Sequence, residues 1–168
     1  IGQILEFSRL DAQPEEAPET IDLTELLESV VEDVRYENQG NDDRGLIDLT
    51  SEGACIVNGY PGALRSAFEN VLRNAVLHGQ GSEPVKGELS AQETRAEVVI
   101  SDSGGGVSEE DLAQLFEPFF RSTNAAESAA SGSGLGLAIA SRAIEMNGGA
   151  ISVRNTGSGL EFMVTLPA

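Results

Sequence analysis

The stretch RSAFENVLRNAVLHG, residues 65–79, decides the fold, because it predicts a helix with one buried side and one polar edge. The buried side is a stripe of apolar residues at helical spacing: Ala67, Phe68, Val71, Leu72 and Ala75. Beside this stripe Asn70, Asn74 and His78 recur every four residues. Residues at this spacing lie above one another on a helix. The three polar side chains therefore border the core along a single line.

The two asparagines are unusual in the middle of a helix. Asparagine is a poor helix former, because its side chain competes for nearby backbone groups. Asn70 and Asn74, one turn apart, are therefore interpreted as residues with a side-chain role. Amide oxygens at the border of a cleft can bind a hard cation such as Mg²⁺. A capping or solvent-facing pair is the alternative, and His78 alone fits a rim position better than a ligand position.

The segments around this helix predict an α+β fold. Helices are predicted at 1–11, 61–78, 109–116 and 134–147. A further helix is predicted to begin at the capping pair Asp22 and Glu25 and to end at residue 37. Strands are predicted at 45–51, 54–58, 85–91, 95–102 and as a hairpin within 150–167. The order predicts a two-layer α/β sandwich, with a mixed, mostly antiparallel sheet of about five strands and three main helices on one face.

The chain divides into three expected parts. Residues 1–12 are the end of a helical element that continues upstream, residues 13–20 are a linker rich in Pro and Glu, and residues 21–168 are one domain with a core. A membrane anchor could precede residue 1, although no apolar run within the chain is long enough to span a bilayer. The segment 122–134 is small and polar, and we expect a mobile loop there.

The net charge is strongly negative. The chain has 28 acidic and 10 basic residues, which gives a formal charge of −18. This argues against a nucleic-acid partner, because such binding depends on basic patches. A solubilising surface is the simplest explanation, and binding a polyphosphate would require a metal ion or a local cluster of donors. The single cysteine, Cys55, excludes an internal disulfide and suits a reducing compartment.

A carboxylate follows the predicted strand AEVVISD, residues 96–102. The alternation that buries Ala96, Val98 and Ile100 places Asp102 on the same face. A buried carboxylate is costly without a donor, and an Asx turn at the strand end is one way to provide it. The glycines of SDSGGGV allow close approach of a flat ligand, and Asp102 could then accept a hydrogen bond from an amino group.

The glycine-rich stretch SGSGLGL, residues 131–137, lacks the features of the common phosphate loops. A P-loop needs Lys followed by Ser or Thr after its last glycine, and here Leu137 and Ala138 follow. A dinucleotide-binding turn follows a strand in a βαβ unit, whereas here a polar segment precedes the glycines. What remains is a helix N-terminus, whose free N–H groups can hold phosphate without a lysine.

Four motifs in this order resemble the boxes of the ATP-binding catalytic domain of bacterial sensor histidine kinases. This domain is part of the GHKL superfamily shared with gyrase-type topoisomerases. FENVLRNAVLHG resembles the N box, DSGGGV the DxGxG box, LFEPFFR the F box and GSGLGL the second glycine box. FSRLD, near the start, resembles the end of the helical hairpin that carries the phosphoacceptor. The resemblance covers essentially the whole chain.

The resemblance implies that the domain binds ATP and Mg²⁺. It implies that Asn74 is a Mg²⁺ ligand, that Asp102 accepts from the adenine amine, and that glycines are hinges of a lid at 122–133 anchored by phenylalanines, Phe120 among them. The implied ATP-binding residues are Asn70, Asn74, His78, Asp102, Gly104, Gly106, Val107, Phe116, Phe119, Arg121, Gly132, Gly134, Leu135, Gly136 and Leu137. No catalytic residue is assigned.

Two departures from the family pattern matter. Leu77 stands where many members carry a basic residue; either Arg73 substitutes for it or phosphate affinity is lower. The only histidine is His78, inside the N box, so the phosphoacceptor must lie upstream. By the resemblance, the fragment transfers the γ-phosphoryl group of ATP to a histidine on its own dimerisation domain. The full-length protein would be a membrane-anchored homodimer with this domain in the cytoplasm, and a response regulator would be its further partner.

Other functions remain open for this superfamily. A gyrase-like ATPase has a glutamate one turn before the Mg²⁺-binding asparagine, where this chain has Asn70. The adjacent Glu69 points about 100° away around the helix. A protein-binding module, or a serine kinase of the anti-sigma-factor type, would use the same fold to hold a protein partner. A degenerate domain without ATP is the weakest alternative, because all four boxes are present.

Overall fold

The computed structural model describes residues 2–12, 14, 16–40, 47–79, 83–122 and 133–168. The helices are α1 (Gly2–Leu10), α2 (Leu23–Glu37), α3 (Pro61–His78), α4 (Glu109–Leu112) and α5 (Gly136–Met146). The strands are β1 (Glu19–Asp22), β2 (Ile47–Ser51), β3 (Ile56–Gly59), β4 (Val85–Ala91), β5 (Arg95–Ser101), β6 (Ala150–Asn155) and β7 (Leu160–Pro167). Within the described ranges, no helix has the length and apolar character needed to cross a bilayer.

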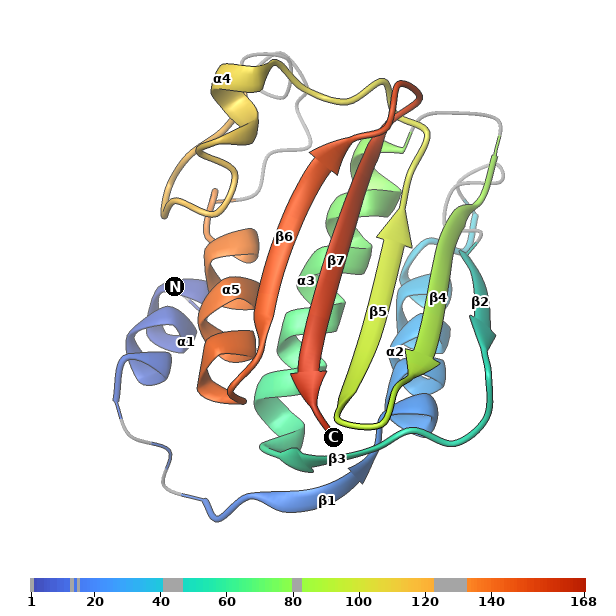
Figure 1. Ribbon diagram of the computed structural model, residues 1–168. Helices are drawn as coiled ribbons and strands as arrows, with labels where there is room; N and C mark the ends of the chain where they lie inside the picture. Colours follow the sequence, from blue (N-terminus) through green and yellow to red (C-terminus); the bar gives the residue numbers. More distant parts are fainter. Residues whose placement is uncertain (1, 13, 15, 41–46, 80–82, 123–132) are drawn as a thin grey trace.

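Five strands form one twisted sheet in the order β2-β4-β5-β7-β6 (Figure 1). Strand β2 runs parallel to β4, and the other three pairs are antiparallel. Helices α2, α3 and α5 cover one face of this sheet, as Figure 1 shows. The predicted fold class, a mixed five-stranded sheet with three main helices on one face, is confirmed.

The core lies between the sheet and these helices. The predicted stripe of α3 is almost completely buried, with Phe68 and Val71 inaccessible to solvent. Alternate residues of the sheet face it, among them Ile100 of β5 and Phe162 of β7, which stand opposite each other in the register. Because both sides of the interface are apolar and close-packed, α3 is fixed in the middle of the helical layer, and its polar edge is fixed with it.

Several element boundaries differ from the sequence-based prediction, and three of the differences have a clear structural basis. Residues 19–22 form a strand, β1, because they pair antiparallel with β3 and bury Ile21. Helix α4 ends at Leu112 rather than 116, because the following residues form tighter turns, in which the N–H of Gln114 donates to the carbonyl of Asp111 at 3.0 Å. Helix α5 starts at Gly136, because Gly134 has a φ of +76°, in the left-handed region.

Side chains cap two helices, and the cap predicted at Asp22 is confirmed. Asp22 accepts hydrogen bonds from the backbone N–H groups of Thr24 at 2.9 Å and Glu25 at 3.4 Å. Ser108 accepts from the N–H of Asp111 at 3.1 Å. Each bond satisfies a donor that the first turn of a helix leaves without a partner.

Asn147 joins the end of α5 to the start of α3. Its side chain is buried, with 8 % of the residue exposed, and its Nδ2 donates to the carbonyl of Ala143 at 2.7 Å. Its Oδ1 accepts from the N–H of Tyr60 at 2.8 Å. A Cβ at Gly59 would lie 2.2 Å from this oxygen, so any larger residue there would have to displace the Asn147 side chain.

Asn147→Ala should therefore lower the free energy of unfolding by about 2 kcal/mol, because it removes a buried amide and leaves the part-buried Tyr60 N–H without its acceptor. The matched control is Asn58→Ala, on an exposed position of β3, which should change it by less than about 0.5 kcal/mol. Urea denaturation of both variants measures the difference. Equal midpoints would contradict the bridging role of Asn147.

Candidate functional site

A buried carboxylate stands at one end of the candidate site. Asp102 directly follows β5, and only 6 % of the residue is exposed. Its Oδ1 accepts from the N–H groups of Gly104 at 2.9 Å and Leu160 at 3.3 Å. Its Oδ2 and the hydroxyl of Ser103 are buried without a hydrogen-bond partner among the described residues. Because such groups are costly, Oδ2 is an acceptor position suited to a ligand donor.

Glycines let three segments meet around Asp102. A Cβ at Gly104 would lie 1.8 Å from the carbonyl oxygen of His78, and one at Gly159 would lie 2.0 Å from the carbonyl oxygen of Asp102. A Cβ at Gly79 would lie 3.2 Å from the Cβ of Asp102. The end of α3, the loop after β5 and the β6–β7 turn are therefore packed backbone against backbone. Gly104 and His78, both predicted site residues, are neighbours of Asp102.

His78 lies at the last turn of α3 and is half-buried. Burial lowers the pKa of its imidazole below the ordinary value, and the negative charge of Asp102 opposes this shift without reversing it. The side chain is therefore neutral at pH 7. A neutral, partly buried ring beside Asp102 can pack against a ligand without adding charge.

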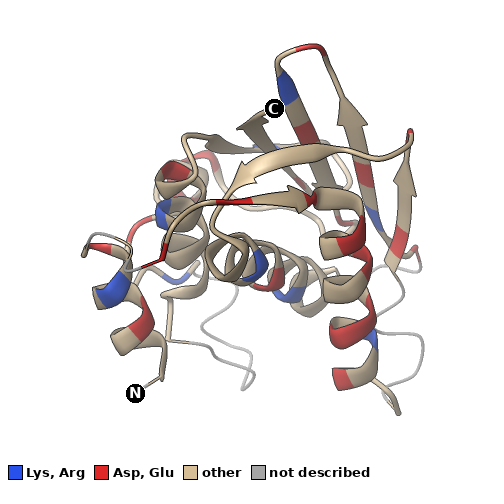
Figure 2. Cartoon of the chain, turned by 90° about the horizontal axis from the view of Figure 1, so that it is seen from below, with Lys and Arg blue, Asp and Glu red and all other residues tan. Residues whose placement is uncertain are grey.

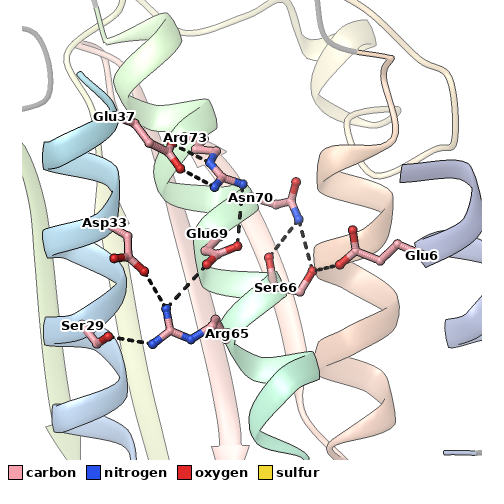
Figure 3. A network of polar contacts seen from close by, with 9 residues as sticks. All are labelled: Glu6, Ser29, Asp33, Glu37, Arg65, Ser66, Glu69, Asn70 and Arg73. Carbon is pink, nitrogen blue, oxygen red and sulfur yellow. Dashed lines mark hydrogen bonds and ion pairs between the residues drawn. The ribbon is translucent and has the colours of Figure 1, made fainter. Parts of the chain in front are cut away.

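The polar edge of α3 leads from this end of the site toward α5. Asn70 and Asn74 are half-buried, so neither side chain is fully exposed to solvent. Asn70 Nδ2 donates to the carbonyl of Ser66 at 2.8 Å, and the Ser66 hydroxyl donates to Glu6 of α1 (Figure 3). A Cβ at Gly136 would lie 2.9 Å from Asn70 Oδ1. The structure thus brings Asn70 together with the first residue of α5.

Among the described residues, no side chain caps the N-terminus of α5. The first N–H groups of the helix have no partner within the helix itself, and this end carries its positive pole. Leu135 and Leu137 are buried, so only their backbone can serve a ligand. The carbonyl of Gly134 accepts a hydrogen bond from the N–H of Phe119 at 3.0 Å. Gly132 and most of the predicted lid, residues 123–132, lie outside the described residues.

The remaining predicted residues are spread between core and surface. Phe116 is half-buried and packs edge-on against Phe162, with ring centroids 6.4 Å apart, so it is part of the core. Phe119 is 65 % exposed and has a φ of 65°. Arg121 is exposed. Val107 is half-buried, and its backbone bonds to the side chain of Asn155.

Arg73 is not oriented to replace the basic residue that many family members carry at the position of Leu77. Its guanidinium makes two hydrogen bonds to Glu37 of α2, at 2.6 and 2.9 Å, and lies 3.7 Å from Glu69 (Figure 3). The bond from Arg73 also lowers the pKa of the Glu37 carboxyl. Arg73 therefore faces α2, at the right of Figure 2, a helix that bears acidic residues along its length.

Sequence reasoning missed three residues that shape the site. Gly79 and Gly159 allow the close approach to Asp102, and Asn155 holds Val107. Glycines such as those at 157–159 are typical of any hairpin turn, and Asn155 has no signal of its own in a single sequence. Their roles depend on contacts between segments that are far apart in the chain, such as Asp102 and Leu160, which are 58 residues apart.

A metal ion at this site would have few protein ligands. No group of three or more His, Cys, Asp or Glu side chains in the described part of the chain could hold one. The amide of Asn74 is half-buried on the edge between Asn70 and His78, and no hydrogen bond ties it to another described residue. Its oxygen fits Mg²⁺, which commonly takes one or two protein ligands and completes its shell with phosphate and water oxygens.

The fold and this site together define a nucleotide-binding domain of the histidine-kinase type. Residues 59–168 match the family model "Histidine kinase-, DNA gyrase B-, and HSP90-like ATPase", and the chain belongs to this family. The resemblance seen in the four sequence motifs is thereby confirmed.

Several sensor histidine kinases are similar to this chain. The sensor-type histidine kinase PrrB of Mycobacterium tuberculosis is 36 % identical over 150 residues, covering 88 % of this chain and 31 % of PrrB. The sensor histidine kinase CpxA of Escherichia coli is 30 % identical, covering 99 % of this chain and 36 % of CpxA. The crystal structure of full-length ShkA in complex with AMPPNP aligns with a TM-score of 0.78 and 29 % identity, over 99 % of this chain and 34 % of ShkA. The chain thus spans about a third of these relatives.

His78 should make stability depend on pH. Because burial lowers its pKa in the folded chain, the unfolded chain binds the proton more tightly. The neutral His78 side chain therefore makes its full contribution to the free energy of unfolding above the unfolded pKa of about 6.5. This contribution is lost as pH falls toward the lower pKa of the folded chain. Urea denaturation between pH 5 and 7.5 should show this loss in the native chain, and His78→Gln should remove it. An identical pH profile in the variant would show that His78 is not the responsible group.

Proposed function

We propose that this chain binds ATP with Mg²⁺ and transfers the γ-phosphoryl group to a histidine of a helical domain in the same full-length protein. The observation that carries the proposal is the buried Oδ2 of Asp102, which has no hydrogen-bond partner in the described part of the chain and adjoins the packed glycines and the end of α3. The family membership and the similarity to sensor histidine kinases support it.

The proposed ATP site extends along the polar edge of α3. Asp102 would accept a hydrogen bond from the amino group of adenine at one end. Asn70 and the uncapped N-terminus of α5 would hold the polyphosphate at the other, where backbone N–H groups substitute for a lysine. Mg²⁺ bound to Asn74 would neutralise charge on the phosphates. Phosphoryl transfer depends mainly on such positioning and charge neutralisation.

The histidine that accepts the phosphoryl group would lie outside this chain. The only histidine, His78, is half-buried beside Asp102 rather than presented to a phosphate end. We propose that α1, within residues 1–12, is the end of the dimerisation and phosphoacceptor hairpin, with residues 13–20 as linker and 21–168 as the catalytic domain. The full-length protein would then be a membrane-anchored homodimer with this domain in the cytoplasm, acting on a response regulator.

ATP hydrolysis of the gyrase type is less well supported. It requires a glutamate to activate water, and Glu69 lies between Arg65 and Arg73 at 3.6 and 3.7 Å (Figure 3). The two guanidinium groups hold this carboxylate on the side of α3 that faces α2. A protein-binding module without nucleotide would have no need for an open acceptor at Asp102.

Calorimetric titration with AMPPNP tests the site at both ends. Asp102→Asn should weaken binding at least tenfold, because an amide replaces the carboxylate that accepts from adenine. Asn74→Ala should leave metal-free binding unchanged and remove most of the affinity gained by adding Mg²⁺.

The matched controls are Asp48→Asn and Asn58→Ala at exposed strand positions, both of which should bind as the native chain does. Native affinity in both Asp102→Asn and Asn74→Ala would contradict the proposed site. Rapid ATP hydrolysis by the native chain without a helical domain would contradict the proposed reaction.

A further inference from the structure

The loop that follows β5 is held by the turn between β6 and β7. Three N–H groups of the loop donate to this turn: Asp102 to the carbonyl of Leu160 at 3.0 Å, Gly105 to the carbonyl of Ser158 at 2.9 Å, and Val107 to Oδ1 of Asn155 at 3.1 Å. Two of these contacts are backbone to backbone. The third depends on one side chain, that of Asn155.

The Asn155 side chain forms hydrogen bonds with both backbone polar groups of one residue, Val107. Besides accepting from the Val107 N–H, it donates from Nδ2 to the Val107 carbonyl at 2.8 Å. The side chain therefore makes the pair of hydrogen bonds that a neighbouring strand would make, beyond the last pair of the β6–β7 ladder, Asn155 and Leu160. Nδ2 also lies 3.4 Å from Oε1 of Glu109, at the start of α4.

The loop conformation depends on such contacts from outside. Gly105 and Gly106 have φ values of 88° and 75°, and a Cβ at Gly106 would lie 2.4 Å from Asn155 Oδ1. Consecutive glycines have many accessible conformations and lose the most entropy when they are fixed. Because the loop has little preference of its own, the hydrogen bonds of the β6–β7 turn must select the conformation that it has here.

We propose that Asn155 is a positioning residue for the adenine end of the site, an inference that rests on the proposed function. It acts through Val107 and the two glycines, which connect it to Asp102. Holding Val107 fixes the loop in the shape that leaves Oδ2 of Asp102 open as an acceptor. Preorganising a binding loop raises affinity, because the ligand need not order the loop on binding.

The competing interpretation is that Asn155 only stabilises the hairpin. A purely structural residue would lower the stability of the fold and leave the affinity of the folded fraction unchanged. Asn147 offers the matched control, because it is also an asparagine that bridges two backbone segments, but it does so between α5 and Tyr60, away from Asp102.

The experiment measures ADP and AMPPNP binding by calorimetry for the native chain, Asn155→Ala and Asn147→Ala, below their unfolding transitions. Asn155→Ala should weaken both nucleotides by the same factor, about five- to tenfold, since the two share the base end of the site. Asn147→Ala should lower the unfolding midpoint at least as much and bind within about twofold of the native chain. Asn38→Ala, at the end of α2, replaces Asn147→Ala if that variant does not fold.

Amide hydrogen exchange gives a second readout. The N–H groups of Gly105 and Val107 should exchange faster in Asn155→Ala than in the native chain, and saturating ADP should restore part of their protection. Asn155→Asp should behave like the alanine variant, because it keeps the acceptor for the Val107 N–H but places a carboxylate against the Val107 carbonyl and Glu109.

Native affinity in Asn155→Ala, with a lowered unfolding midpoint, would overturn the inference and make Asn155 a structural residue only. Affinity lost for AMPPNP but not for ADP would overturn it as well, since the effect would then lie at the phosphate end. Failure of the proposed function is distinguishable from both outcomes, because the native chain itself would then bind neither nucleotide.

Discussion

The carboxylate of Asp102 is the constraint on which the rest of the site depends. It is almost completely buried at the end of a central strand, and only one of its oxygens is paired with described residues. Leaving a buried carboxylate half-satisfied costs free energy that a folded chain could avoid with one more donor. The fold instead surrounds Asp102 with glycines and packs three segments against it. This arrangement is consistent with a role for Oδ2 of Asp102 as the hydrogen-bond acceptor for a ligand.

Helix α3 connects this acceptor to the other half of the site. Its apolar stripe is fixed in the core, and this fixes the position of its polar edge. The edge extends from His78 to Asn70, which lies beside the start of α5. The outer side of the same helix carries Arg65, Glu69 and Arg73, which pair with residues of α2 or with each other (Figure 3). One helix thus separates a structural ion-pair network from the candidate ligand site.

Most of the fold was predictable from the sequence, because periodicity reports burial directly. The stripe of α3 and the alternation of β5 both identified core residues, and the same alternation placed Asp102 inside. Strand β1 was not predictable, since four residues carry little pattern and their pairing with β3 is a tertiary contact. The sequence left the role of Arg73 open for the same reason: its partner Glu37 is 36 residues away in the chain.

The most direct test of the account is a crystal structure of the chain with AMPPNP and Mg²⁺. We expect the exocyclic amine of adenine within about 3 Å of Asp102 Oδ2, so that the oxygen without a partner gains one. The polyphosphate should lie beside Asn70 and the first turn of α5. A nucleotide bound with its base elsewhere, and with Asp102 Oδ2 still unpaired, would contradict the central claim.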